Sequence, residues 1–151
     1  MKILLAVDGT QPSAAAVAML GNFRFAGGEI KIISIVEMAV PFAAEGHAGA
    51  PPTMGEIENA ARENARRVAA AASRIIRETV KDETVSISTE ILFGSPDRRI
   101  VETAVTMNAD LIIVGSHGSN LWKRLLHGSV SEAVVHHAPC SVLIVKNPQV
   151  I

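Results

Sequence analysis

The sequence has few aromatic residues, no excess of positive charge and a single cysteine. It holds four Phe, one Trp and no Tyr, and its formal net charge is −1. A near-neutral chain lacks the basic surface of a nucleic-acid binder, and so few aromatic rings exclude a base-stacking platform. A single cysteine, Cys140, cannot form an intrachain disulfide, and no metal-ligand cluster accompanies it. These absences favour a cytoplasmic protein.

Long hydrophobic runs are also missing. No segment approaches the roughly 20 apolar residues of a transmembrane helix. The apolar start, residues 1–7, ends at Asp8 and is shorter than the core of most signal peptides, about 7–15 residues. We therefore expect a soluble, unprocessed protein that does not bind membranes. With 48% hydrophobic residues, the chain can bury one core, and we expect a single domain over residues 1–151.

Short apolar segments alternate with amphipathic ones along the whole chain. The alternation predicts strands at residues 2–7, 29–36, 85–92, 110–115 and 140–146, and helices at 12–20, 56–80, 96–108 and 129–137. Such alternation is typical of an α/β fold with a parallel sheet, covered by helices on both faces. We thus predict an open, Rossmann-like sheet of five parallel strands.

The composition of the strands indicates their order. The first and fourth are continuously apolar, as in strands buried on both faces, whereas the third alternates apolar with polar residues, as at an edge. Right-handed crossovers then allow the order 3-2-1-4-5, with a switch point between strands 1 and 4. This order makes Asp8 and Gly115, which end those two strands, neighbours in one crevice.

The longest predicted helix has clear signals. Thr53 and Glu56 have capping-box spacing at its start. Its apolar stripe is expected to contain Ile57, Ala61, Val68, Ala72, Ile75 and Ile76. The helix also carries five arginines, which spacing pairs with glutamates: Glu58 with Arg62, Glu63 with Arg67 and Glu78 with Arg74. We interpret these charges as a solvated surface and not as a polyanion site.

A glycine-rich segment follows the fourth strand. The sequence reads Gly115-Ser116-His117-Gly118, then nine residues, then Gly128-Ser129 at the start of the last helix. Glycines allow sharp turns and close approach to a ligand, and a helix start offers free N–H groups to an anion. Neither the dinucleotide fingerprint nor the Walker loop is present. Ordinary turns are the alternative, but the combination favours a phosphate-binding loop.

These residues resemble the universal stress protein family, whose ATP-binding members carry G-x2-G-x9-G-[ST] at this place. The resemblance extends through Ser131-Glu132, residues 137–140 and residues 142–145. It implies the same strand order and a bound ATP, with Mg²⁺ or Mn²⁺. It also implies phosphate contacts from Gly118, Gly128, Ser129 and Val130, and places Gly115 near the ribose, Asp8 at the nucleoside and the Val36 main chain at the adenine edge.

Several candidates keep a second interpretation. Asp8 could hold an Asx-turn instead of the ligand, and Val36 is otherwise only the end of a buried strand. Ala6, Ser116, His117 and Ser131 complete the nucleotide-binding candidates, and Ser131 could simply support the helix. We predict no catalytic residues, because Ser116 and His117 are adjacent and not opposed, and no nucleophile elbow occurs.

The function that these features favour is an ATP-binding stress-response or signalling module. Residues 140–145, from Cys140 to Val145, are apolar on both faces and end the sheet, so we expect a homodimer through this strand. A slow ATPase or nucleotide-processing enzyme at the same site is the first alternative. A dimeric scaffold with an empty pocket is the second. The sequence specifies no protein partner.

Overall fold

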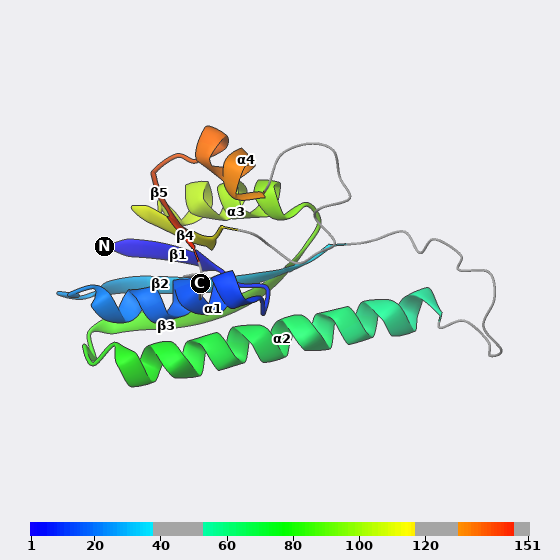
Figure 1. The fold of residues 1–151 in the computed structure, drawn as a ribbon, viewed down its shortest axis with the longest axis horizontal. Coiled ribbons are helices and arrows are strands. Elements are labelled where there is room, and N and C mark those ends of the chain that lie inside the picture. Colours follow the sequence, from blue (N-terminus) through cyan, green and yellow to red (C-terminus); the bar gives the residue numbers. More distant parts are fainter. Residues whose placement is uncertain (38–52, 117–129, 147–151) are drawn as a thin grey trace, which may run out of the picture.

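The protein forms an open five-stranded parallel sheet (Figure 1). The computed structural model describes residues 1–37, 53–116 and 130–146. The sheet contains β1 (Lys2–Ala6), β2 (Gly28–Val36), β3 (Val85–Phe93), β4 (Leu111–Gly115) and β5 (Ser141–Val145). Their order is β3-β2-β1-β4-β5 and all neighbours are parallel, so the predicted fold class and strand order are confirmed.

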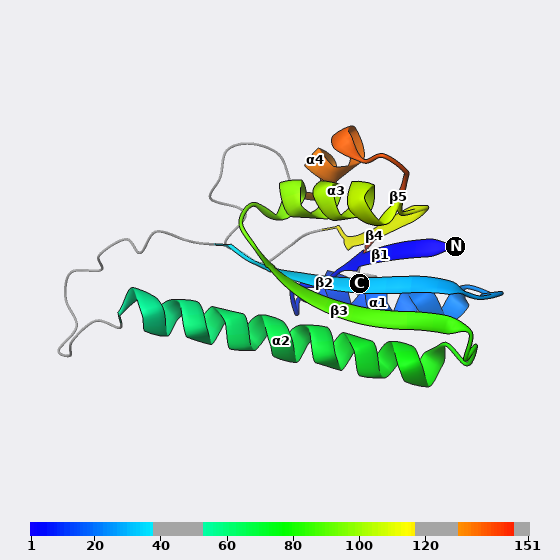
Figure 2. The ribbon, with the colours of Figure 1, turned by 180° about the vertical axis from the view of Figure 1, so that it is seen from behind.

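Within the described residues, four α-helices cover the sheet. They are α1 (Gln11–Met19), α2 (Met54–Thr79), α3 (Pro96–Met107) and α4 (Val130–His137), and a 3-10 turn at Leu20–Asn22 extends α1. The pair α1 and α2 lies on one face of the sheet and the pair α3 and α4 on the other (Figures 1 and 2). The predicted boundaries that fall in the described residues lie within two residues of these.

Each face of the sheet has its own hydrophobic core. Leu5 and Ile32 pack toward α1 and α2, whereas Leu4 and Ile33, their neighbours in sequence, pack toward α3 and α4. All four side chains are fully buried. Because successive residues of a strand point to opposite faces, a strand covered on both sides must be continuously apolar, which is the pattern of β1.

Helix α2 begins with the predicted capping box. The Thr53 N–H donates to Glu56 Oε2 at 2.7 Å, and the Glu56 N–H donates to Thr53 Oγ1 at 3.3 Å. The N-terminal part of the helix lies past the carboxyl ends of the strands, and the helix then runs back along the sheet (Figure 1). In that overhang Ile57 is 37% exposed.

The buried stripe of α2 differs from the prediction. Its buried residues are Ala65, Ala69, Ala72 and Ile76, whereas Ile75 is 40% exposed. Of the predicted stripe, Ala72 and Ile76 are buried, Ala61 and Val68 are half-buried, and Ile57 and Ile75 are exposed at its margin. Small side chains let the helix lie close to the sheet, so alanine occupies most of the contact and the larger isoleucine at 75 lies beside it.

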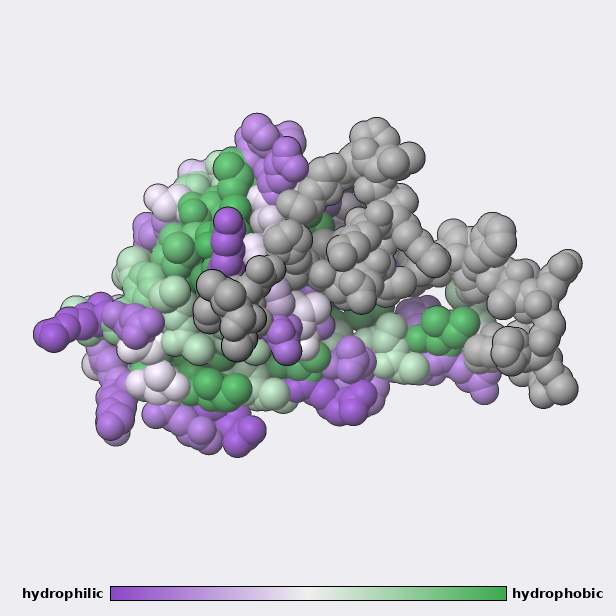
Figure 3. All heavy atoms as spheres, viewed as in Figure 1, coloured by the Kyte–Doolittle hydropathy of each residue, from purple (hydrophilic) through white to green (hydrophobic). Residues whose placement is uncertain are grey.

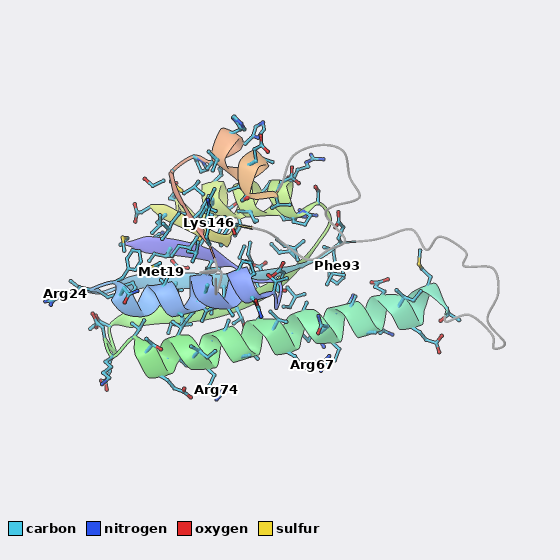
Figure 4. The ribbon with its side chains drawn as sticks, in the orientation of Figure 1. Met19, Arg24, Arg67, Arg74, Phe93 and Lys146 are labelled. Carbon is cyan, nitrogen blue, oxygen red and sulfur yellow. The ribbon has the colours of Figure 1, made fainter. Side chains whose placement is uncertain are left out.

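The charged face of α2 is mostly as predicted. Arg62 pairs with Glu58 at 3.3 Å and Arg74 with Glu78 at 3.6 Å. The predicted pair between residues 63 and 67 is wrong, because Glu63 contacts Arg66 at 3.9 Å. Figure 4 shows the arginines at 67 and 74 projecting away from the sheet.

Arg62 differs from the other arginines of α2. Its guanidinium carbon lies 4.8 Å from the centre of the Phe93 ring, at the end of β3. The side chain is 40% exposed, and its Nε is buried without a hydrogen bond to any residue that the structure describes. Arg62 therefore packs against the sheet as well as facing solvent.

Candidate functional site

A pocket lies at the carboxyl ends of the central strands, where the strand order reverses. It is lined by Ala6, Val7, Asp8, Thr10, Ser13, Ile35, Pro96, Ile100, Val114, Gly115, Val130 and Ser131. These residues come from the ends of β1, β2 and β4 and from the starts of α1, α3 and α4. Open α/β sheets bind ligands at such a switch point, because the loops after adjacent strands run to opposite faces there.

Asp8 lies two residues after the end of β1 and shapes the loop before α1. Its Oδ1 accepts hydrogen bonds from the Thr10 N–H at 3.0 Å and from Thr10 Oγ1 at 2.6 Å. This is the Asx-turn that the sequence allowed. The same carboxylate also lines the pocket. The turn and a ligand contact are therefore compatible, since a carboxylate offers about four acceptor positions.

Gly115, at the end of β4, is required by packing. A Cβ atom there would lie 2.8 Å from the carbonyl carbon of Pro12 and 2.9 Å from the Ser13 nitrogen. Both are backbone atoms in the first turn of α1, which consequently lies directly against the end of β4. The glycine thus brings the loop after β1 and the end of β4 into the neighbouring positions that the strand order predicted.

Three helices begin at this pocket. Thr10 is the N-cap of α1, Pro96 is the first residue of α3 and Val130 is the first residue of α4, and all three line the pocket. The Thr10 hydroxyl does not cap α1, because it bonds to Asp8 instead. Helix N-termini carry partial positive charge and unpaired N–H groups, so their convergence favours a negatively charged ligand.

Two serines connect the end of β4 to α4. Ser131 is 7% exposed, and its Oγ donates to the Ser116 carbonyl oxygen at 3.4 Å. The Ser116 N–H in turn donates to the Val145 carbonyl oxygen of β5 at 2.9 Å. Ser131 therefore fixes the first turn of α4 against β4, and it lines the pocket as well.

Val36 occupies a different place from the other described candidates. Its side chain is 5% exposed, and its carbonyl oxygen accepts the Gly94 N–H at 3.1 Å. The preceding residue, Ile35, lines the pocket and Val36 does not. Ala6 does line it. The remaining candidates, His117, Gly118, Gly128 and Ser129, lie outside the described residues.

Sequence reasoning missed part of the pocket wall. Ile35, Pro96, Ile100 and Val114 were indistinguishable from core residues, and no local signal marks them as lining a pocket. Thr10 and Ser13 did carry a signal, because two hydroxyl residues follow Asp8 within one turn of the first helix. The Asp8 N–H donates to Ser13 Oγ at 3.1 Å, which completes the loop.

Neither a protein-built metal centre nor a membrane-spanning helix occurs in the part of the chain that the structure describes. Within those residues, no three His, Cys, Asp or Glu side chains gather where they could hold a metal ion. Asp8 is the single carboxylate among the described residues of the pocket wall. None of the described helices is long and apolar enough to cross a bilayer.

Known proteins resemble this chain in sequence and fold. Universal stress protein MJ0531 of Methanocaldococcus jannaschii is 42% identical over 74 residues, which are 49% of this chain and 44% of that protein. The match thus spans less than half the length of this relative. Universal stress protein UspA from Lactobacillus plantarum has a similar structure, with a TM-score of 0.71 and 25% identity over 96% of this chain and 97% of that one.

Two further structures share the fold and contain nucleotides. One is a universal stress protein in complex with cAMP, with a TM-score of 0.67, 22% identity and 96% of each chain covered. The other, from Archaeoglobus fulgidus, is in complex with dAMP, with a TM-score of 0.65, 19% identity and 97% and 98% covered. The sequence profile of the universal stress protein family matches residues 1–146. By this match over nearly its whole length, the chain belongs to the universal stress protein family.

Proposed function

We propose that this protein is a nucleotide-binding stress-response module that takes ATP in the pocket at the ends of β1 and β4. The observation that carries the proposal is the convergence of three helix N-termini on a pocket lined by Asp8 and Gly115. A nucleotide needs both an acceptor for its sugar hydroxyls and donors for its phosphates. The complexes of related folds with cAMP and dAMP support an adenine nucleotide.

The pocket suggests how the ligand is divided among the elements. We assign the ribose to Asp8 and Gly115 and the phosphates to the start of α4. Val130 begins that helix, and Gly118, Gly128 and Ser129 precede it in the family pattern. We assign the adenine to the end of β2, where Ile35 offers an apolar wall, and the family resemblance assigns the adenine edge to the Val36 main chain. Ser116, His117 and Ala6 complete the proposed site.

We propose that Mg²⁺ or Mn²⁺ enters with the phosphates. The described residues of the pocket wall offer one carboxylate, Asp8, and the described residues form no ligand cluster of their own. Such hard cations prefer oxygen ligands and keep several waters when they bind with a nucleotide. When bound, the ion neutralises charge on the phosphate oxygens. The protein's part is to hold those oxygens at the helix starts.

We further propose that the protein acts as a homodimer through β5, with residues 1–151 as one domain. The strand pairs with β4 alone, so one edge of its backbone remains bare in the described residues. Hydrophobic residues reach the surface over the region of β5 and α4 (Figure 3), among them Val135 and Ile144. The unpaired N–H and C=O groups of an apolar edge strand can pair with the same strand of a second copy. Nucleotide occupancy would then act through the dimer.

Mass spectrometry of nucleotide that co-purifies with the folded protein tests the binding proposal. We expect ATP or another adenine nucleotide, close to one per chain. The matched variants are Gly118→Val and Gly128→Val, whose side chains would fill space assigned to phosphate oxygens. Both should fold, as judged by circular dichroism, and both should carry no nucleotide. Normal nucleotide content in either variant would show that the phosphate site lies elsewhere.

A further inference from the structure

Ser13 has an unusual position for a helix serine. It lies in the first turn of α1, is 4% exposed and lines the pocket. Its Oγ accepts the Asp8 N–H at 3.1 Å, which uses a lone pair of the hydroxyl. The hydroxyl proton, in contrast, is donated to none of the residues that the structure describes. Ser13 therefore presents an unused donor at the wall of the pocket.

Three threonines in the described helices do use their proton. Thr79 donates to the Ile75 carbonyl at 2.6 Å, Thr103 to the Arg99 carbonyl at 2.7 Å and Thr106 to the Glu102 carbonyl at 2.8 Å. Each is the common bond to the residue four positions earlier. Ser13 does not make it. A buried donor without an acceptor is unfavourable, so an acceptor from the ligand or its water is expected at this place.

The neighbouring groups restrict which part of a nucleotide can face Ser13. The Asp8 carboxylate, which lines the same pocket, only accepts hydrogen bonds, whereas the Ser13 hydroxyl has a proton to give. A phosphate supplies no proton to Asp8 at neutral pH and is repelled by its charge. The adenine ring is assigned to the end of β2. A ribose hydroxyl is both donor and acceptor, so one such group satisfies Asp8 and Ser13 together.

We propose that the Ser13 hydroxyl binds the nucleotide by donating to a ribose hydroxyl oxygen, the same hydroxyl that donates to Asp8. This inference rests on the proposed function, since it needs a ribose in the pocket. It adds Ser13 to the ligand contacts and makes the site selective for a sugar with that hydroxyl. Both side chains line the pocket, and the Asp8 N–H bond to Ser13 Oγ fixes the serine against the loop that carries Asp8.

Isothermal titration with ATP, 2′-deoxyATP and 3′-deoxyATP tests this contact. Ser13→Ala should weaken ATP binding by about three- to tenfold, the usual effect of one hydrogen bond. For the deoxy analogue that lacks the shared hydroxyl, Ser13→Ala and wild type should bind equally well. The control is Ser34→Ala, on β2, because Ser34 is 3% exposed and does not line the pocket. This control should leave all three affinities unchanged.

Three results would overturn the inference. Unchanged ATP binding by Ser13→Ala would show that no such bond forms. An equal loss for ATP and both analogues would show that Ser13 only supports the Asp8 loop. If Ser13→Ala does not fold, Ser13→Thr replaces it as the test, because threonine retains the hydroxyl. Ser13→Thr should keep the wild-type preference for ATP over the analogue that lacks the shared hydroxyl. Loss of that preference would contradict the proposal. Absence of nucleotide binding by wild type would instead refute the proposed function itself.

Discussion

At the scale of single residues, Asp8 combines a structural and a proposed binding role. One carboxylate oxygen holds Thr10 in the Asx-turn, and the side chain lines the pocket. We expect Asp8→Ala to weaken ATP binding by about 1–2 kcal/mol, the loss of one charge-assisted hydrogen bond. Asp8→Asn keeps an oxygen for Thr10 but removes the charge, so it should bind with intermediate affinity.

Titration calorimetry on both Asp8 variants, with thermal melting as the check on folding, separates the two roles. If Asp8→Asn binds ATP as tightly as wild type, the charge has no part in binding and Asp8 acts only through the turn. Melting temperatures should separate the variants differently. Asp8→Asn preserves the turn acceptor and should melt close to wild type, whereas Asp8→Ala loses it and should melt at a lower temperature.

The close packing at Gly115 predicts that a larger residue there lowers the stability of the fold. A Cβ at this position would meet the backbone of Pro12 and Ser13 at 2.8–2.9 Å, and backbone cannot move aside without displacing α1. We expect Gly115→Ala to lower the free energy of unfolding by about 1–3 kcal/mol. The control is Gly55→Ala in α2, where a Cβ meets nothing within 4 Å. It should be neutral, or stabilising by up to about 1 kcal/mol. Urea denaturation of the two variants gives the comparison, and equal stabilities would contradict the packing argument.

At the scale of elements, the start of α2 should respond to pH. The hydrogen bond from the Thr53 backbone, and then the one from its side chain, hold the pKa of Glu56 below its ordinary value of 4.5. A lowered folded-state pKa means that the ionised carboxylate contributes stability above pH 4.5. This contribution is lost as the pH falls through the folded-state pKa.

Glu56→Gln tests this pH dependence. The variant should be less stable than wild type well above pH 4.5, and the difference should shrink well below it, where the wild-type carboxyl is protonated. Denaturation curves at both pH values provide the measurement. Glu83→Gln, after the end of α2, is the control, because Glu83 is exposed and makes no ion pair or hydrogen bond with the described residues. A stability difference that does not change with pH would mean that the capping box contributes nothing through its charge.

The exposed edge of the sheet carries the prediction about assembly. Ile144 lies on β5, an apolar strand that pairs with β4 on one side only, and it is 37% exposed. We expect Ile144→Lys to weaken the dimer and leave the fold intact, because a charge there would be buried between two copies. Val105→Lys on α3, 57% exposed in the monomer, is the control and should not change assembly. Sedimentation that finds wild type monomeric at high concentration would contradict the dimer.

Element types and the strand order could be predicted because their causes are local. Continuous apolar runs mark β1 and β4 as central, and the alternation in β3 marks an edge. The buried face of α2 was harder, since it depends on how closely the helix approaches the sheet. Alanines such as Ala65 and Ala69 fill that contact, and hydrophobic size alone gives them little weight.

At the scale of the whole molecule, the site was only partly predictable. Asp8, Gly115 and Ser131 stand next to strand ends or a helix start, so the topology alone brings them together. Ile35 and Pro96 reach the same pocket from elements distant in sequence. An apolar wall residue and a core residue have the same local pattern, and only the three-dimensional arrangement distinguishes them.

The composition of the pocket predicts slow turnover or none. Its described wall contains no histidine, lysine or arginine, and its carboxylate is engaged with Thr10. Phosphoryl transfer needs an aligned acceptor and charge placed on the leaving oxygens, and binding energy alone does not lower the barrier. We expect ATP hydrolysis well below about 1 s⁻¹, the lower end of ordinary enzymes. A contaminant-controlled sample that hydrolyses ATP at about that rate or faster, with the activity lost in Gly128→Val, would identify an enzyme.

The central claim is that the switch-point pocket binds a nucleotide, and isothermal titration of the purified, nucleotide-free protein with MgATP tests it most directly. We predict saturable heat with one site per chain and a rise in melting temperature. Both effects should be absent in Gly128→Val. No heat and no thermal shift at roughly millimolar MgATP, a concentration that would detect even weak binding, would contradict the account.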